Sequence, residues 1–136
     1  MIFLDTCILI DYSKNNTILI PDKVEYCFNS IVQLEFLVGA LNKRELQKIN
    51  KIISEFKIID NGQDVLDLSV ILVNHYALSH NMTIYDSIIA ATCLIYDIEL
   101  WTYNKKDFKY IDGLRLVTWD LAILLTELCI PLDVNQ

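Results

Sequence analysis

Short apolar runs alternate with longer amphipathic stretches along the chain, and this alternation constrains the fold more than any other feature. The runs that predict strands are 1–4, 24–28, 56–59, 98–102 and 114–117. Apolar residues at helical spacing predict helices over 7–13, 32–43, 43–55, 64–78 and 87–96. Strands that alternate with helices form a parallel sheet with helices on both faces. We therefore expect an α/β protein with three layers, α/β/α, around a central and mainly parallel sheet.

Size and composition favour one compact domain without a membrane span. The chain has 136 residues, 54% of them hydrophobic, with 3 Gly and 2 Pro, which leaves little room for linkers. Apolar stretches such as 88–96 and 121–125 are far shorter than the roughly 20 residues of a spanning helix. The start, MIFLDTCILID, lacks the basic segment of a signal peptide. We expect a cytoplasmic protein.

Cysteine and histidine do not predict a metal site. The four cysteines are scattered among apolar neighbours without a CxxC pair: Cys7, Cys27, Cys93 and Cys129. This pattern is typical of buried free thiols. His75 and His80 are five residues apart on a predicted helix, so they point in different directions and are expected at the surface.

Four acids have both a structural and a chemical interpretation. Asp5 follows a predicted strand and can cap the next helix, and Asp86 can likewise cap the helix that follows it. Asp107 can be a surface turn residue. Glu35 lies in the most apolar stretch of its predicted helix. Because an unpaired acid is rarely buried, we expect Glu35 to have a partner or a metal.

Taken together, the acids predict a site for a divalent metal. In a parallel sheet, ligands bind beyond the carboxyl ends of the strands, and Asp5, Thr102 and Asn104 stand at such ends. Four carboxylates gathered at one edge would repel each other, and divalent cations would relieve that repulsion. An all-oxygen set suits Mg²⁺ or Mn²⁺ rather than zinc, and such ions support hydrolysis of phosphoesters.

Five segments carry a further pattern. They are LDT at 4–6, the Glu35 helix with Gly39 four residues on, DSIIAAT at 86–92, TYNKKDF at 102–108 and GLRLV at 113–117. In this order they resemble the PIN-domain nucleases of the VapC toxin type. The match runs from about Ile2 to Trp119, which is nearly the whole chain.

The resemblance implies a metal-dependent endoribonuclease, a toxin that cuts structured RNA such as tRNA or ribosomal RNA and is neutralised by a VapB antitoxin. Homodimers whose active sites face a shared groove are typical of such proteins. The acids expected to be catalytic and to hold Mg²⁺ or Mn²⁺ are Asp5, Glu35, Asp86 and Asp107. Thr6, Thr102 and Asn104 would orient these carboxylates or the attacking water.

The chain departs from the family pattern at two places. Cys7 stands where many relatives have Asn, which removes one polar group beside Asp5. The chain also continues past Trp119 with DLAILLTELCIPLDVNQ. We expect residues 1–119 to form the PIN domain and residues 120–136 to form a C-terminal helical extension packed on or next to it.

The net charge of −7 argues on its face against binding to RNA. If the four acids hold two divalent ions, the charge becomes −7 + 4 = −3, so the local distribution matters more. The candidate phosphate contacts are Arg44, Lys48 and Lys51 on a helix, and Lys105, Lys106 and Lys109 around Asp107. The alternative is that both groups are ordinary solvated faces.

Other functions fit the sequence less well. A haloacid-dehalogenase-like phosphatase would need a DxD motif where the chain has DTC, and a receiver domain would need an acidic pair. A nucleotide-binding fold would need a glycine-rich loop, which 3 Gly cannot supply. The alternative from another class is a catalytically silent PIN-like interaction module. The presence of all four acids favours the enzyme, and only turnover separates the two.

Overall fold

The computed structural model describes residues 1–14, 20 and 23–118, and a parallel sheet lies at its centre. The strands are β1 (Ile2–Leu4), β2 (Tyr26–Phe28), β3 (Lys57–Ile58) and β4 (Glu99–Trp101). Their order is β3-β2-β1-β4, and every neighbouring pair is parallel. A single parallel bridge between Leu100 and Leu116 continues the pattern beyond β4. The predicted parallel sheet is confirmed.

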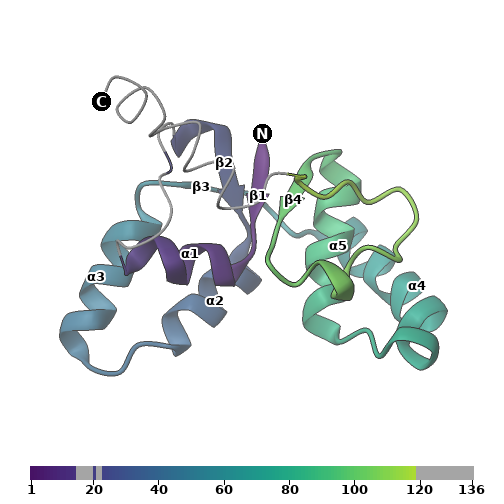
Figure 1. Ribbon diagram of the computed structural model, residues 1–136, viewed down its shortest axis with the longest axis horizontal. Helices are drawn as coiled ribbons and strands as arrows, with labels where there is room; N and C mark the ends of the chain where they lie inside the picture. Colours follow the sequence, from purple (N-terminus) through teal and green to yellow (C-terminus); the bar gives the residue numbers. More distant parts are fainter. Residues whose placement is uncertain (15–19, 21–22, 119–136) are drawn as a thin grey trace, which may run out of the picture.

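Helices cover both faces of this sheet. They are α1 (Thr6–Ser13), α2 (Ser30–Val38), α3 (Lys43–Ile53), α4 (Gln63–His80) and α5 (Ile84–Tyr96), with short 3₁₀ helices η1 (Lys23–Glu25) and η2 (Lys105–Asp107). The chain runs from β1 to β2 to β3 in one direction across the sheet, and then returns to β4 on the other side of β1. Because crossover connections are right-handed, connections in opposite directions place their helices on opposite faces. Figure 1 shows α1 and α3 on one side of the sheet and α4 and α5 on the other. The predicted three-layer α/β/α architecture is confirmed.

Several predicted boundaries differ from those in the structure. The helix predicted over 32–43 ends at Val38, because Asn42 begins a new helix and accepts a hydrogen bond from the Glu45 backbone N–H at 2.9 Å. The strand predicted over 24–28 begins only at Tyr26, because η1 precedes it. The strand predicted over 114–117 is reduced to the bridge at Leu116.

The core lies on both sides of the central strands. Phe3 and Leu4 in β1 and Phe28 in β2 are fully buried. Cys27 and Cys93 are buried free thiols as predicted, whereas Cys7 is only half-buried. Cys129 and the extension predicted over 120–136 lie outside the described residues. Within the described part of the chain, no helix is long and apolar enough to cross a membrane.

Strand order positions three buried polar residues at one edge of the sheet. Asp5, Asn29 and Thr102 directly follow β1, β2 and β4, and their exposed fractions are 5%, 0% and 2%. β1 and β4 are neighbours whose connections leave in opposite directions, which makes the space between their carboxyl ends the switch point of the fold. Asp5 and Thr102 stand at this point.

Candidate active site

Asp5 is the most firmly held of the predicted site residues. It is the N-cap of α1, and its Oδ1 accepts a hydrogen bond from the Thr6 backbone N–H at 2.8 Å. Its Oδ2 accepts a hydrogen bond from Thr102 Oγ1 at 2.7 Å. Its own backbone N–H donates to the Trp101 carbonyl at 3.0 Å. Both oxygens of this carboxylate are therefore fixed in direction by the ends of β1 and β4.

Burial raises the pKa of Asp5 above its usual range, and the nearby charge of Glu35 raises it further. The hydrogen bonds from Thr102 and Thr6 act against this rise, because they favour the ionised form. The fold thus carries an acid whose charge is costly to bury. It also brings Glu35 from α2 close enough for the two charges to interact.

Glu35 is exposed, so the expectation that it is buried within an apolar helix is wrong. α2 buries Val32 and Phe36, which are four residues apart on one face, and Glu35 lies beside that face. Tyr85 lies near Glu35: burial chiefly raises the pKa of its phenol, and the charge of Glu35 raises it further. Glu35 is therefore close enough to Asp5 and Tyr85 for their electrostatic interaction, without being part of the core.

Asp86 lies in the first turn of α5, where it is half-buried. The predicted N-cap position for Asp86 is wrong: Thr83 is the N-cap, and its Oγ1 accepts a hydrogen bond from the Asp86 N–H at 3.0 Å. Asp86 stands three residues later, at the position that completes a capping box, and hydrogen bonding with Thr83 acts to lower its pKa. Burial raises the pKa of Asp86, and the charges of Asp107 and Asp5 raise it further.

Asp107 and three lysines lie on the loop that follows β4. Asp107 is half-buried in η2, and its N–H donates to the Asn104 carbonyl at 3.0 Å. The Asn104 N–H in turn donates to Thr102 Oγ1 at 3.0 Å, which ties the loop to the hydroxyl that holds Asp5. Lys105, Lys106 and Lys109 are exposed around Asp107.

Cys7 joins the same polar network through its thiol. Its Sγ lies 3.7 Å from Asp5 Oδ2 and accepts a hydrogen bond from the Tyr103 N–H at 3.5 Å. Burial and the charge of Asp5 raise the pKa of this thiol to about 11, so it is protonated at neutral pH and can donate to Asp5. Cys7 therefore supplies a weak hydrogen-bond donor beside Asp5.

A divalent cation fits these residues by the chemistry of their donors. All four acids offer oxygen ligands, and a cation would relieve the burial and mutual repulsion that raise the pKa of Asp5 and Asp86. Within the residues described, no three His, Cys, Asp or Glu side chains are grouped closely enough to hold one metal ion. The acids would have to close in around an ion for three of them to share it.

Sequence reasoning missed two polar residues at this edge of the sheet. Asn29 is fully buried, caps α2 by accepting a hydrogen bond from the Val32 N–H at 3.1 Å, and donates to Thr92 Oγ1 at 3.0 Å. An Asn before a predicted helix is a capping signal, so Asn29 could have been found. Tyr85 is bonded to Thr6, which is 79 positions away, and no local signal predicts such a contact.

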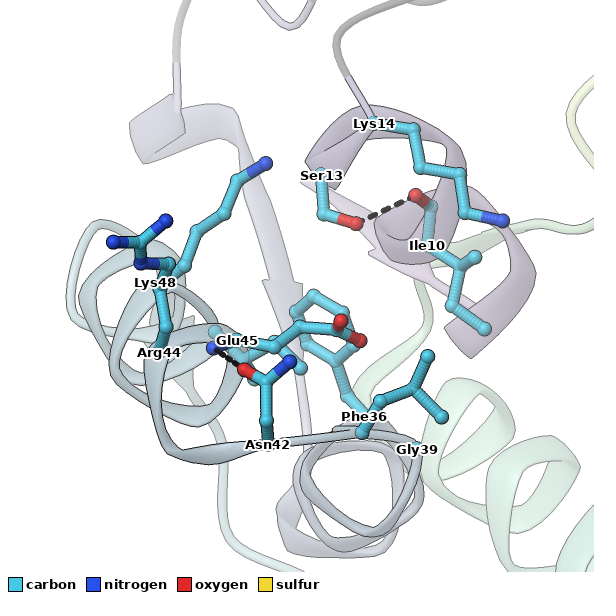
Figure 2. Close-up of a pocket in the computed structure, with 11 residues that line it drawn as sticks. Ile10, Ser13, Lys14, Phe36, Gly39, Asn42, Arg44, Glu45 and Lys48 are labelled. Atoms are coloured by element: carbon cyan, nitrogen blue, oxygen red, sulfur yellow. Dashed lines mark hydrogen bonds between the residues drawn. The ribbon is translucent and has the colours of Figure 1, made fainter.

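A separate cleft of about 500 Å³ lies between α1, α2 and α3, as Figure 2 shows. Phe36 and Ile49 are buried side chains that line it, and Ile10 lies at its more exposed side. Arg44 and Lys48, two of the predicted phosphate contacts, also line this cleft, and all four acids lie outside the lining. The structure thus places Arg44 and Lys48 at a cleft that Lys105, Lys106 and Lys109 do not line.

The family profile of the PIN domain matches residues 2–114. The chain belongs to the PIN domain family, which confirms the resemblance found in the sequence. A relative from Methanocaldococcus jannaschii, named ribonuclease VapC1, is 26% identical over 121 residues, 88% of this chain and 87% of the relative.

Solved structures share the fold along most of the chain. A chain from a toxin–antitoxin complex of Klebsiella pneumoniae superposes with a TM-score of 0.69 and 29% identity, covering 88% of this chain and 99% of that one. A chain from DNA-bound VapBC of Salmonella typhimurium gives a TM-score of 0.71 and 22% identity, covering 85% of this chain and 96% of that one.

Proposed function

We propose that the chain is a metal-dependent endoribonuclease that hydrolyses RNA phosphodiester bonds and acts as the toxin of a toxin–antitoxin pair. The observation that carries the proposal is the electrostatic coupling of four acids from four separate elements: Asp5, Glu35, Asp86 and Asp107. The pKa values of Asp5 and Asp86 are raised, and acids with raised pKa values near a strand switch point are typical of functional sites. The relative named ribonuclease VapC1 supports RNA as the substrate, and a cytoplasmic location would give access to it.

In this proposal the four acids would hold Mg²⁺ or Mn²⁺. The ion, when bound, would supply an activated water and polarise the scissile phosphate. Asp5 provides a carboxylate whose direction is set by Thr6 and Thr102. Asp86, whose pKa is raised, is suited to accept a proton from the attacking water. Asn104 would help to orient that water, and Lys105, Lys106 and Lys109 would contact RNA phosphates.

Cleavage of total cellular RNA by the purified protein tests this function. We expect discrete products with Mg²⁺ or Mn²⁺, none with EDTA, and none from Asp5→Asn. Asp11→Asn is a matched control, because it removes the same charge from α1 at an acid bonded to Tyr103 instead. If protein shown by mass spectrometry to be free of antitoxin cuts no RNA with either ion, the silent PIN-like module becomes the better account.

The proposed partner is a VapB-like antitoxin, since related chains were solved in toxin–antitoxin complexes. The cleft offers an apolar floor with Lys14, Arg44 and Lys48 at its rim, which suits an apolar segment carrying acids. Phe36 lines the cleft while its neighbour Glu35 interacts with the charge of Asp5, so one segment could reach both places. An Arg of the antitoxin that reaches the acidic site would pair with its carboxylates and block it.

A substitution at the edge of the cleft separates antitoxin binding from catalysis. Ile10 lines the cleft and is 40% exposed, so Ile10→Asp should place an unpaired charge in the interface without breaking the core. We expect weaker antitoxin binding and unchanged RNA cleavage by the free toxin. Unchanged antitoxin affinity would place the interface elsewhere.

A homodimer is also part of the proposal. Leu66 and Val70 on α4 and Ile84 at the start of α5 form an exposed apolar surface. The residues that line its hollow carry no charge, so a second copy could cover it without repulsion. Val70→Asp should then yield a monomer in light scattering, and an unchanged dimer would place the interface on another face.

A further inference from the structure

We infer that Asn29 is a positioning residue that sets the spacing between Glu35 and Asp86, because its side chain joins the start of α2 to α5. This inference rests on the proposed function. Asn29 directly follows β2 and is the N-cap of α2, the helix that carries Glu35. Its side chain donates to Thr92 Oγ1 at 3.0 Å, and Thr92 lies on α5, the helix that carries Asp86. One buried amide thus joins the two helices that present these acids.

The orientation of the Asn29 amide follows from its partners. The Val32 N–H can only donate, so Asn29 Oδ1 faces it and accepts at 3.1 Å. Asn29 Nδ2 then faces Thr92 Oγ1, which accepts from it and gives its single proton to the Ile88 carbonyl at 2.7 Å. A directed chain of hydrogen bonds therefore runs from the backbone of α2 to the backbone of α5.

Burial makes the bond between Asn29 and Thr92 specific. Both residues are fully buried, with exposed fractions of 0%. A buried amide that loses its partner costs free energy, so placements of α2 against α5 that break the bond are disfavoured. Apolar side chains would let the two helices slide or rotate, whereas a single buried polar pair specifies one register, as a buried Asn does in coiled coils. The bond therefore selects one placement of α2 against α5.

The two acids lie at equal sequence distances from this bond. Glu35 follows Asn29 by six residues, and Asp86 precedes Thr92 by six residues. At the rise of an α-helix, each acid is about 9 Å along its own helix from the bond. Glu35 and Asp86 each interact with the charge of Asp5, so both lie near the same carboxylate. A shift of one helix against the other would therefore change the spacing of the two acids.

Packing alone constrains α2 weakly. This helix has nine residues, and its buried side chains are Val32 and Phe36. An element with few buried apolar contacts shifts at low cost. Partners that orient metal ligands typically contribute roughly tenfold to hundredfold in metal affinity or activity. The bond from Asn29 to Thr92 would supply this placement before an ion arrives.

The test is Asn29→Ser beside Thr92→Val. Serine keeps an oxygen that can cap α2 but is too short to reach Thr92, and valine keeps the shape of threonine without its hydroxyl. We expect Mn²⁺, measured by calorimetry on the metal-free protein without RNA, to bind about tenfold more weakly to each variant. RNA cleavage should show a lower kcat with KM unchanged, because the bond acts on the acids and not on the lysines. The double variant should lose little more than either single variant, since both changes remove one bond.

Two controls separate positioning from a general loss of stability. Thr92→Ser keeps the hydroxyl and should restore Mn²⁺ affinity and kcat to near the wild-type values. Asn42→Ser makes the same change at the N-cap of α3, where the side chain accepts from the Glu45 N–H of its own helix, and it should leave both unchanged. Circular dichroism confirms that each variant is folded. Wild-type Mn²⁺ affinity in Thr92→Val, or an equal loss in Thr92→Ser or Asn42→Ser, would overturn the inference.

A metal-free measurement distinguishes this inference from the proposed function. Residual dipolar couplings of the backbone amides give the angle between α2 and α5 without any ion. We expect one fixed angle in the wild-type protein and a changed or averaged angle in Thr92→Val. If the wild-type protein neither binds Mn²⁺ nor cuts RNA, the proposed function fails, yet the couplings still show whether Asn29 fixes the two helices. The same fixed angle in both proteins would contradict the role of the bond.

Discussion

The fold holds the two sides of the acidic site by different means. On the Asp5 side, Asp5 follows the central strand β1 and hydrogen bonds fix both of its carboxylate oxygens, while Glu35 lies near it on α2. The Asp107 side, made of Asp86 and Asp107, comes from a helix start and a 3₁₀ turn, and both of its acids are only half-buried. Asp5 is fixed by the sheet, whereas Asp107 lies on an exposed loop among lysines.

This difference predicts which side would move if an ion binds at the proposed site. Asp5 is 5% exposed and bonded to residues of β1 and β4, so moving it would disturb the sheet. Asp107 lies on a loop whose side chains are mostly exposed, and such elements open and shift at low cost. If an ion binds at the proposed site, the Asp107 side would therefore move toward Asp5 more readily than Asp5 would move toward it.

The largest expected effect comes from removing charge on the two sides separately. Asp5→Asn should lower kcat by about a thousandfold or more, because no other group can take the place of a carboxylate fixed by the sheet. Asp107→Asn should cost about tenfold to hundredfold, since the loop can readjust around the remaining ligands. Single-turnover cleavage of a defined RNA measures both, and circular dichroism confirms that the fold is retained. Equal losses would contradict the difference between the two sides.

A smaller effect is expected from the lysines on the Asp107 side. The triple variant of Lys105, Lys106 and Lys109 to Ala should weaken RNA binding about tenfold and reduce the salt dependence of log Kd, because each phosphate contact releases counterions. The matched control is the triple Ala variant of Arg44, Lys48 and Lys51, which removes the same net charge from α3.

The control separates a phosphate contact from a general effect of charge. Fluorescence anisotropy with a labelled RNA at several salt concentrations gives the slope for each variant. An unchanged slope in the first variant would contradict the loop contacts. A reduced slope in the second would support the helix contacts predicted from sequence. Weaker antitoxin binding with an unchanged slope would instead assign Arg44 and Lys48 to the cleft, which they line.

The sequence predicted the fold well because its signals are local. Each strand run and each amphipathic helix is a pattern of neighbouring residues, and their alternation implies the parallel sheet. The place of Asp5 and Thr102 at the switch point also follows, since both directly follow strands. A predicted helix boundary was wrong where a polar residue caps the next helix, as Asn42 caps α3.

What the sequence could not predict depends on contacts between distant residues. Burial of Glu35 was expected from its apolar neighbours, but a helix of nine residues buries only one face, and Glu35 lies beside it. The capping role of Thr83 instead of Asp86 depends on where α5 begins, which composition does not fix. The bond between Tyr85 and Thr6 appears only once α5 is placed against α1.

The smallest expected effect is on the pH dependence of stability, which should differ between Asp5 and Asp86 because they are buried to different extents. The pKa of Asp5 is raised in the folded state above its ordinary value of 3.8, so the folded protein binds the proton more tightly than the unfolded chain does. The metal-free protein should therefore gain stability from Asp5 as pH falls from neutral through the raised pKa, with the full gain below about 3.8.

Urea unfolding of the wild-type protein and of Asp5→Asn at several pH values isolates this contribution as the difference between the two curves. As pH falls, the free energy of unfolding of the wild-type protein should rise relative to that of Asp5→Asn. The same comparison with Asp86→Asn should show a smaller rise, because Asp86 is only half-buried. Saturating Mg²⁺ should reverse the trend, since the ion binds the deprotonated carboxylates and stabilises the folded state at neutral pH. A difference that is independent of pH without metal would mean that burial of Asp5 is not costly. The site would then have no electrostatic reason to require a cation.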